Sequence, residues 1–287
     1  MTDSNLKIAF FGTPRLAQIV LLHLLDSDFK PSIIVTSPDA KSGRGQNLNF
    51  SPVKTTATEK GIEVIQDLKQ LPQFDLAILI AFGKILPKEI LGIPKYGFLN
   101  IHPSLLPKYR GPSPIQTAIL NGDGETGVTI IKLDEQVDHG PMYGKKTIEI
   151  EKTDTHMALI EKLGLLGSNL LLEVLPSYLA NNLKAEEQDH AQATTTKHIA
   201  KTDGFIDVQN PPDPQTLDRM IRAYFPWPTV WAEIGTRDRE PETSKLRIKL
   251  LPNQIVQPEG KKPMGIKEFF NGYPQAKAQM EKLIAQT

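Results

Sequence analysis

The chain has 287 residues, about twice the length of a typical domain, which predicts two domains. Apolar residues make up 39% of it and charged residues 23%, as in an ordinary soluble globular protein. Basic residues (Lys plus Arg) and acidic residues (Asp plus Glu) number 33 each, so the net charge gives no sign of strong non-specific nucleic-acid binding. A local basic patch could still bind a nucleic acid. The chain has no Cys, which excludes disulfides, thiolate zinc sites and a cysteine nucleophile.

The start of the chain lacks the layout of a signal peptide, because its first apolar run is short and breaks at Gly12 and Pro14. The most apolar stretch, residues 157–179, carries charged side chains that include Glu161 and Lys162. A membrane span of that length carries few or no charges, so we expect a buried amphipathic helix there. Together these patterns favour a cytoplasmic protein.

Short apolar runs alternate with helical patterns along the first two-thirds of the chain. Almost wholly apolar runs are typical of parallel strands that are covered on both faces. Their alternation with helices predicts an α/β fold with a doubly wound, mostly parallel sheet. In chain order, the sequence predicts a strand at 7–11, a helix at 16–25, a strand at 31–36, a helix at 52–60, strands at 62–65, 75–81, 97–101 and 128–133, and a helix at 155–179.

Changes in composition predict how the chain divides. We expect the α/β domain to cover residues 1–180 and a polar, weakly periodic linker to cover residues 181–204. We expect the remainder, residues 205–287, to form a second and smaller domain. It contains a helical pattern at 215–224 and alternating, strand-like patterns at 230–234 and 246–250.

Reactive side chains follow two of the predicted strands. Asn100 and His102 end one strand, where alternation puts them on the same face, about 6.5–7 Å apart along the strand. Asp138 and His139 precede Gly140 in the turn after the next strand. Ligands of open α/β sheets bind beyond the carboxyl ends of strands. An amide donor, an imidazole and a carboxylate can move a proton and stabilise an oxyanion, so Asn100, His102 and Asp138 are candidate catalytic residues.

Each of these three residues also has a structural interpretation. Alone, His102 is more often a structural hydrogen-bond partner, Asn100 a turn cap and Asp138 an Asx-turn residue. The chain has no GxSxG motif, no GxGxxG after the first strand and no GxxxxGK[ST], which disfavours a serine nucleophile, a dinucleotide and a nucleoside triphosphate. Its histidines lack the spacing of metal ligands.

The segment from His102 to Pro112 links this strand to the next helix. Pro103 and Pro107 stiffen the segment, and Gly111 permits a sharp turn. A rigid loop beside acid–base residues is suited to holding a planar ligand through backbone groups. Taken alone, the same loop is also a plain proline-rich connector.

Several stretches of the chain resemble the folate-dependent formyltransferases, most closely their methionyl-tRNA formyltransferase branch. The likeness continues towards the end of the chain and covers nearly all of it. The pattern N-x-H-x-SLLPxxRG with a downstream Asp-containing turn is highly specific for the superfamily. The matching stretches are FFGTPRLA (10–17), SPDAKSGRGQNLNFSPVK (37–54), AFGKILP (81–87), GFLNIHPSLLPKYRGPSPIQ (97–116), TGVTIIKLDEQVDHGPM (126–142), IRAYFPWPTVW (221–231) and EGKKPM (259–264).

The resemblance implies a reaction of translation initiation, in which the formyl group of 10-formyltetrahydrofolate moves to the α-amino group of methionyl initiator tRNA. It implies a Rossmann-like catalytic domain without a metal, in which the catalytic asparagine, histidine and aspartate are Asn100, His102 and Asp138. It also implies that the folate donor is bound by Ser104, Leu105, Leu106, Pro107, Phe82, Gly83, Ile85, Leu86 and Val137.

The resemblance further implies a C-terminal OB-like β-barrel that touches tRNA. In this chain only eleven residues separate Ile234 from Leu246, so we expect a shortened barrel that lacks about one hairpin or more, and its selectivity among tRNAs stays open. We expect the protein to be a monomer whose partners are folate and initiator methionyl-tRNA, without a membrane. The candidate tRNA-binding residues are Lys41, Arg44, Lys245, Arg247 and Lys249.

Other functions remain open at this point. A sugar-nucleotide N-formyltransferase would use the same folate donor and the same three catalytic residues but a sugar amine as acceptor. A non-catalytic RNA-binding relative would use only the 37–54 loop and the basic strand. Hydrolysis of the formyl-folate would release free formate without any formylated amine.

Overall fold

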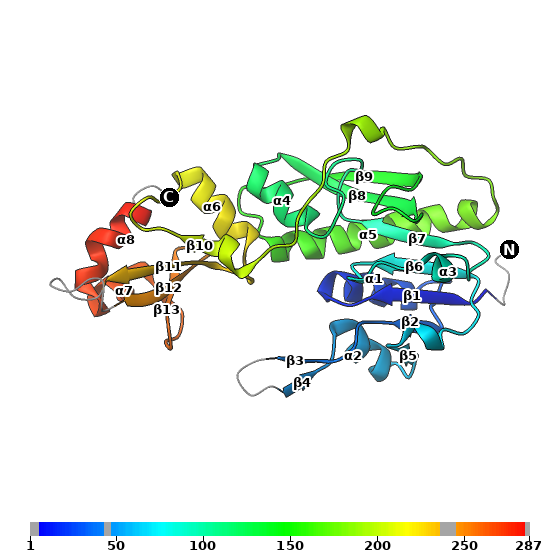
Figure 1. Ribbon diagram of the computed structural model, residues 1–287, viewed down its shortest axis with the longest axis horizontal. Helices are drawn as coiled ribbons and strands as arrows, with labels where there is room; N and C mark the ends of the chain where they lie inside the picture. Colours follow the sequence, from blue (N-terminus) through cyan, green and yellow to red (C-terminus); the bar gives the residue numbers. More distant parts are fainter. Residues whose placement is uncertain (1–5, 43–46, 236–244, 285–287) are drawn as a thin grey trace. The chain divides into compact units, whose positions relative to one another are not determined.

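The computed structural model describes residues 6–42, 47–235 and 245–284 (Figure 1). The contacts within the chain divide it into two compact units. The first unit consists of Met1–Pro114, Glu125–Glu149 and Ile160–Lys197, and the second consists of Ile115–Gly124, Ile150–Leu159 and His198–Thr287. The domain boundaries expected from the sequence stay a prediction.

A seven-stranded sheet with the strand order β5-β2-β1-β6-β7-β8-β9 organises the first unit (Figure 1). Its first five strands are parallel, and β8 and β9 are antiparallel. The mostly parallel α/β sheet predicted from the sequence is thereby confirmed. The elements are β1 (Ile8–Gly12), α1 (Arg15–Leu25), β2 (Ile33–Val35), β3 (Ala40–Ser42), β4 (Asn47–Asn49), α2 (Pro52–Glu59), β5 (Glu63–Ile65), η1 (Leu68–Gln70), β6 (Leu76–Ile80), α3 (Lys88–Leu91), β7 (Phe98–His102), β8 (Glu125–Lys132), β9 (Met142–Glu149) and η2 (His190–Gln192).

Two helices extend across the division of the chain. They are α4 (Pro114–Asn121) and α5 (His156–Leu179). In α5, two glycines allow close packing in the first unit. A Cβ on Gly164 would lie 2.9 Å from Ile19 of α1, and one on Gly167 would lie 2.7 Å from Ile101 of β7. The glycines therefore let α5 approach both α1 and one face of the sheet.

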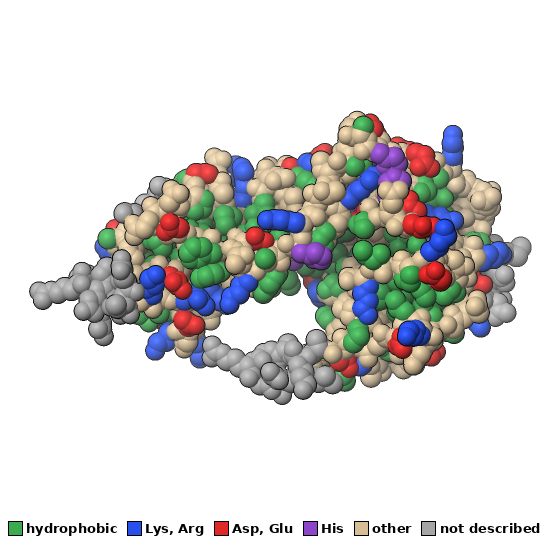
Figure 2. Space-filling view, viewed as in Figure 1, with side chains coloured by type: hydrophobic (Ala, Val, Ile, Leu, Met, Phe, Trp, Pro, Cys, Tyr) green, Lys and Arg blue, Asp and Glu red, His purple; other side chains and the backbone are tan. Residues whose placement is uncertain are grey.

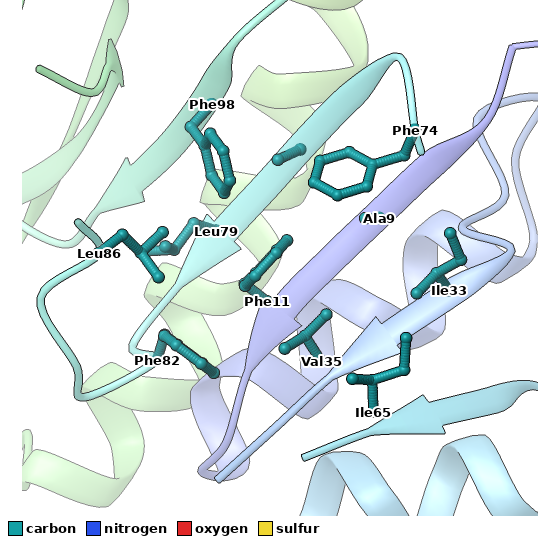
Figure 3. Packing of buried hydrophobic residues seen from close by; sticks show 11 residues of the cluster. Ala9, Phe11, Ile33, Val35, Ile65, Phe74, Leu79, Phe82, Leu86 and Phe98 are labelled. Atoms are coloured by element: carbon teal, nitrogen blue, oxygen red, sulfur yellow. The ribbon is translucent and has the colours of Figure 1, made fainter. Parts of the chain in front are cut away.

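An aromatic cluster packs on the other face of the sheet (Figure 3). The ring centroids of Phe11 and Phe98 are 5.1 Å apart, and those of Phe11 and Phe82 are 5.5 Å apart in an edge-on arrangement. Alternate residues of a strand share a face, so Asn100 and His102 extend from the face on which Phe98 packs. This well-packed core is the rigid support for the end of β7.

The turn between β8 and β9 closes tightly because of one glycine. A Cβ on Gly140 would lie 1.9 Å from the carbonyl oxygen of Lys132, which no side chain can tolerate. The Lys132 amide in turn donates to the Pro141 carbonyl at 3.0 Å. Since β8 runs beside β7, this closure folds Asp138 back towards the end of β7.

The second unit is built on a five-stranded sheet with the strand order β10-β11-β12-β13-β14. The small β-rich C-terminal region predicted from the sequence is confirmed, and residues 236–244, where the barrel was expected to be shortened, lie outside the described residues. Helices α7 and α8 were not predicted. The elements are η3 (Lys201–Gly204), β10 (Phe205–Ile206), α6 (Pro214–Ala223), β11 (Val230–Gly235), β12 (Lys245–Leu251), β13 (Ile255–Pro258), β14 (Met264–Gly265), α7 (Ile266–Gly272), η4 (Pro274–Ala276) and α8 (Lys277–Ile284).

Within the described ranges, no helix combines the length and the apolar character that crossing a membrane requires.

Candidate active site

Three polar side chains predicted from the sequence meet at the carboxyl end of β7. The Asn100 amide donates from Nδ2 to Oδ1 of Asp138 at 3.2 Å. The same carboxylate oxygen lies 3.5 Å from Nδ1 of His102. Asn100 and His102 are buried, and the side chain of Asp138 is only 12% exposed. The structure therefore brings together an amide, an imidazole and a carboxylate. In the chain, Asp138 is 38 residues from Asn100 and 36 residues from His102.

The ring orientation of His102 follows from its second contact. Its Nε2 lies 2.8 Å from the backbone carbonyl of Tyr109. A carbonyl only accepts hydrogen bonds, so Nε2 carries the hydrogen, and Nδ1 is the ring atom that faces Asp138. Nδ1 is thus the atom that is placed to take up or release a proton at the site.

The Asp138 carboxylate is held from two sides. Its Oδ2 accepts a hydrogen bond from the backbone amide of Gly111 at 2.8 Å, while its Oδ1 accepts one from the Asn100 side-chain amide. Asp138 has a φ of +49°, in the left-handed region that aspartate tolerates better than most residues. Gly111 has a φ of +104°, which favours glycine. The geometry of both residues is therefore set by backbone conformation as well as by hydrogen bonds.

The loop after β7 is tied to β8 and β9. The Ser104 hydroxyl donates to the Lys108 carbonyl at 2.6 Å, and the Leu106 amide donates to the Thr129 hydroxyl at 3.1 Å. Lys145 donates from Nζ to the Leu106 carbonyl at 2.7 Å. Ser104 and Leu106 are fully buried. Their side chains support the loop from inside, so a ligand at this loop would meet backbone groups and the half-buried Leu105 and Pro107.

The other residues predicted to bind folate separate into a buried and an exposed set. Phe82 and Leu86 belong to the aromatic cluster. Ile85 is 80% exposed and Val137 is 53% exposed, so both apolar side chains are open to contact by a ligand. Lys88 and Glu135 form an ion pair of 2.6 Å that joins the chain segments carrying these two residues. Gly83 has a φ of +81°, so the turn between Phe82 and Ile85 needs a glycine.

The candidate tRNA-binding residues have unequal surroundings. Arg44 lies outside the described residues, and Lys41 belongs to β3. Arg247 lies 3.2 Å from the Glu233 carboxylate and 4.6 Å from the Trp231 ring, and Lys245 lies 4.0 Å from the same carboxylate. Lys249 is paired with Trp231 across the sheet. On the face shown in Figure 2, the basic side chains of the second unit are interspersed with acidic ones.

Several groups at the site were not predicted from the sequence. The Tyr109 carbonyl and the Gly111 amide are backbone atoms, which side-chain patterns do not reveal. Arg110 donates to Gln188 at 2.7 Å and to Nδ1 of His190 at 2.8 Å. Gln188 and His190 lie in the polar segment expected to be a linker, and nothing in its composition marks them.

The network around Arg110 continues to a second histidine. The rings of His190 and His139 are stacked, with centroids 4.0 Å apart, and Nδ1 of His139 lies 2.7 Å from the Asp134 carboxylate. In the part of the chain that the structure describes, no group of three or more His, Asp or Glu side chains is arranged to hold a metal ion.

Comparison with known proteins identifies relatives over nearly the whole chain. Residues 6–175 match the family described as Formyl transferase. The methionyl-tRNA formyltransferase of Methylococcus capsulatus is 35% identical, over 93% of this chain and 97% of that protein. The methionyl-tRNA formyltransferase of Caldanaerobacter subterraneus is 36% identical with the same coverage of each chain.

Solved structures share the fold. An N-formyltransferase from Helicobacter canadensis, in complex with folinic acid and dTDP-3-aminofucose, matches with a TM-score of 0.61 and 20% identity, over 88% of this chain and 94% of that one. The family match covers more than half of the chain, and the two methionyl-tRNA formyltransferases match at nearly full length. The chain belongs to the methionyl-tRNA formyltransferase family.

Proposed function

We propose that this protein transfers the formyl group of 10-formyltetrahydrofolate to the α-amino group of methionyl initiator tRNA and so produces N-formylmethionyl-tRNA for translation initiation. The observation that carries the proposal is the meeting of Asn100, His102 and Asp138 at one point in a chain of this family. Aminoacylated tRNA is made and used in the cytoplasm, where we place the protein.

Asn100 stabilises the formyl oxygen as it gains negative charge. A carboxylate only accepts hydrogen bonds, so the contact with Asp138 fixes Nδ2 as the amide atom that faces Asp138. Nδ2 carries two hydrogens, and one of them forms the hydrogen bond to Asp138. The second hydrogen is the donor for an oxyanion, a contact that typically contributes on the order of 10²–10³ in rate.

His102 and Asp138 move the proton. The acceptor amine attacks in its neutral form, which a pKa of about 7.7–8.0 makes accessible near neutral pH. As the new bond between the amine nitrogen and the formyl carbon forms and the old carbon–nitrogen bond breaks, the amine loses a proton and the leaving nitrogen gains one. Nδ1 of His102, which faces the Asp138 carboxylate, receives the proton either directly from the amine or through Asp138, and then releases it to the leaving nitrogen.

The exposed apolar side chains favour binding of the folate donor beside these residues. Ile85 and Val137 provide apolar walls, and the backbone from Phe82 to Leu86 and at Val137 supplies hydrogen-bonding groups to the edge of a pterin. Buried Ser104 and Leu106 hold the facing loop. The donor, when bound, supplies the activated formyl group.

For the acceptor, we propose that Lys41, Arg44, Lys245, Arg247 and Lys249 contact tRNA phosphates. Lysine and arginine contacts to phosphates position a nucleic acid without reading its sequence. The neighbouring Glu233 neutralises part of the charge of Arg247 and Lys245, so Lys249 carries the larger share in the second unit. We propose a monomer that needs no membrane.

The test is a formyl-transfer assay with purified protein, 10-formyltetrahydrofolate and either initiator or elongator methionyl-tRNA. Formylmethionine formed preferentially on the initiator supports the whole proposal. Equal transfer to both tRNAs keeps the reaction but removes the discrimination. Transfer only to an amino sugar nucleotide would replace the proposal by a sugar N-formyltransferase. Free formate without a formylated amine would indicate hydrolysis, and no turnover of the donor would leave a non-catalytic RNA-binding relative.

A further inference from the structure

The segment that follows α5 is bound to the loop beside the catalytic candidates. The Arg110 amide donates to the Thr194 carbonyl and the Thr196 amide donates to the Arg110 carbonyl, each at 2.8 Å. Earlier in the same segment, Glu186 exchanges two backbone hydrogen bonds of 2.7 and 2.9 Å with Met142. The segment from Glu186 to Thr196 therefore touches both the loop before Gly111 and the chain just after the Asp138 turn.

Gln188 is the buried side chain in the middle of this segment, and only 4% of it is exposed. Its Nε2 donates to the carbonyl of Asp138 at 2.9 Å and to the carbonyl of Gly140 at 2.8 Å. Its Oε1 accepts from the Arg110 guanidinium at 2.7 and 3.2 Å. Carbonyls only accept and a guanidinium only donates, so these partners fix which end of the amide is oxygen. Both hydrogens and both lone pairs of the amide are used.

Gln188 is bonded to both sides of one hydrogen bond at the site, through Asp138 itself and through the neighbour of Gly111. That bond runs from the Gly111 amide to Oδ2 of Asp138. Gln188 holds Asp138 through its backbone carbonyl and holds Gly111 through the neighbouring Arg110. The φ of +49° at Asp138 shows that its backbone occupies a sparsely populated conformation, which surrounding contacts must maintain.

We propose that Gln188 is a positioning residue of the formyl-transfer reaction, which holds the Asp138 carboxylate in register with Asn100 and His102. This inference rests on the proposed function and extends it to a segment whose composition is that of a linker. The amide of Gln188 is fully occupied by Arg110 and by the backbone at Asp138 and Gly140, so it acts on the site through Asp138. Misplacing a catalytic group by about 1 Å costs on the order of a hundredfold in rate.

Three variants distinguish the effect of the whole Gln188 amide from the effect of its donor end alone, and both from a general effect of substitution in this segment. Gln188→Met keeps the length and removes all four hydrogen bonds. Gln188→Glu keeps the acceptor for Arg110 but places a carboxylate against two carbonyls. The matched control is Gln192→Met, because Gln192 is exposed and its side-chain amide donates to Asp189 at 2.7 Å in the same segment.

The decisive measurement is a double-mutant cycle with Asp138→Asn, read by single-turnover formyl transfer with excess enzyme. We expect Gln188→Met and Gln188→Glu to lower the rate on the order of ten- to a hundredfold at an unchanged KM for 10-formyltetrahydrofolate, and Gln192→Met to match the wild type. In the Asp138→Asn background, Gln188→Met is expected to cost less than about twofold, since residues that act as a unit are not additive.

Two results would overturn the inference. One is a Gln188→Met rate within about twofold of the wild type; the other is the same fold-loss in both backgrounds, which would mark Gln188 as part of general stability only. Thermal unfolding of each variant ensures that rates are compared for folded protein. A wild-type protein that fails to formylate methionyl-tRNA would instead refute the proposed function, so the two failures are distinguishable.

Discussion

Asn100 donates from Nδ2 to Oδ1 of Asp138 at 3.2 Å across 38 residues of sequence. The contact orients the Asn100 amide, since the carboxylate accepts only from the nitrogen end. It also leaves one Nδ2 hydrogen for a ligand. Both properties are what a donor to a developing oxyanion requires.

Replacement of Asn100 or His102 by alanine therefore tests the proposed roles. We expect Asn100→Ala to lower kcat on the order of 10²–10³ through loss of the oxyanion donor. We expect His102→Ala to lower kcat on the order of 10²–10⁴ through loss of the proton carrier. Folate binding, measured by equilibrium titration, is expected to stay within a fewfold of wild type. Near wild-type turnover in either variant would refute its assignment.

Gly140→Ala is expected to displace Asp138 without touching a polar side chain. The added Cβ would lie 1.9 Å from the Lys132 carbonyl oxygen, so the backbone of the turn has to move. We expect a kcat loss on the order of a hundredfold, measured by single-turnover transfer. In the control Gly124→Ala, nothing lies within 4 Å of the new Cβ, and activity is expected to be unchanged. Full activity of Gly140→Ala would mean that the turn tolerates displacement.

The sequence predicted the central strands of the α/β sheet to within a few residues, because buried parallel strands are continuous apolar runs. The strand predicted at 97–101 is β7, and the helix predicted at 155–179 is α5. The edge strand β9 was not predicted. Its burial alternates and it contains Lys145 and Lys146, so it lacks the apolar run on which the prediction depends.

For the candidate site, strand alternation correctly placed Asn100 and His102 near one another, because period-two geometry is local. The return of Asp138 depends on Gly140 packing against Lys132, a contact that composition does not encode. Gln188 lies in a stretch of polar residues with no periodicity. The positioning role that we propose for it rests on tertiary hydrogen bonds alone, so sequence patterns could not reveal it.

Ile85→Ser tests the apolar wall proposed for the folate donor. Ile85 is 80% exposed, so its replacement is expected to leave the unfolding temperature unchanged. Loss of apolar contact with the ligand is expected to raise the KM for 10-formyltetrahydrofolate about five- to thirtyfold, which corresponds to about 1–2 kcal/mol. Leu165→Ser is the control, since Leu165 is an exposed residue of α5. An unchanged KM in Ile85→Ser would place the donor elsewhere.

Glu233→Gln tests the basic strand of the second unit. The Glu233 carboxylate lies 3.2 Å from Arg247 and 4.0 Å from Lys245, so its removal frees positive charge for phosphates. We expect tRNA to bind about two- to fivefold more tightly at low salt, as the loss of a partly exposed ion-pair partner allows. Plots of log affinity against log salt are expected to steepen by about 0.7–0.9 for each additional phosphate that the protein neutralises.

The exposed Glu268 provides a matched control for that variant. Glu268→Gln changes the net charge equally without touching Arg247 or Lys245, and it is expected to leave the salt dependence as in the wild type. Equal effects of the two variants would mean that overall charge, rather than the strand, governs tRNA binding.

His156 is expected to make stability fall in acid. Burial disfavours the imidazolium and lowers the pKa of His156 to about 4, while a backbone hydrogen bond with Phe225 acts in the opposite direction. Its Nδ1 is buried without a hydrogen-bond partner among the described residues. In the unfolded chain the pKa is about 6.5, so between these values the unfolded state binds more protons and the free energy of unfolding falls as the pH falls.

The size of this effect follows from the same linkage and amounts to about 2 kcal/mol lost between pH 8 and pH 5. Urea denaturation at both pH values measures it. The variant His156→Phe keeps an aromatic ring but has no titratable group. On moving to pH 5, its free energy of unfolding is expected to rise by about 2 kcal/mol relative to that of the wild type. His198→Phe, at an exposed histidine, is the control for general effects of the substitution. If His156→Phe kept the same pH dependence as the wild type and the control, the titration of His156 would not account for the loss of stability in acid.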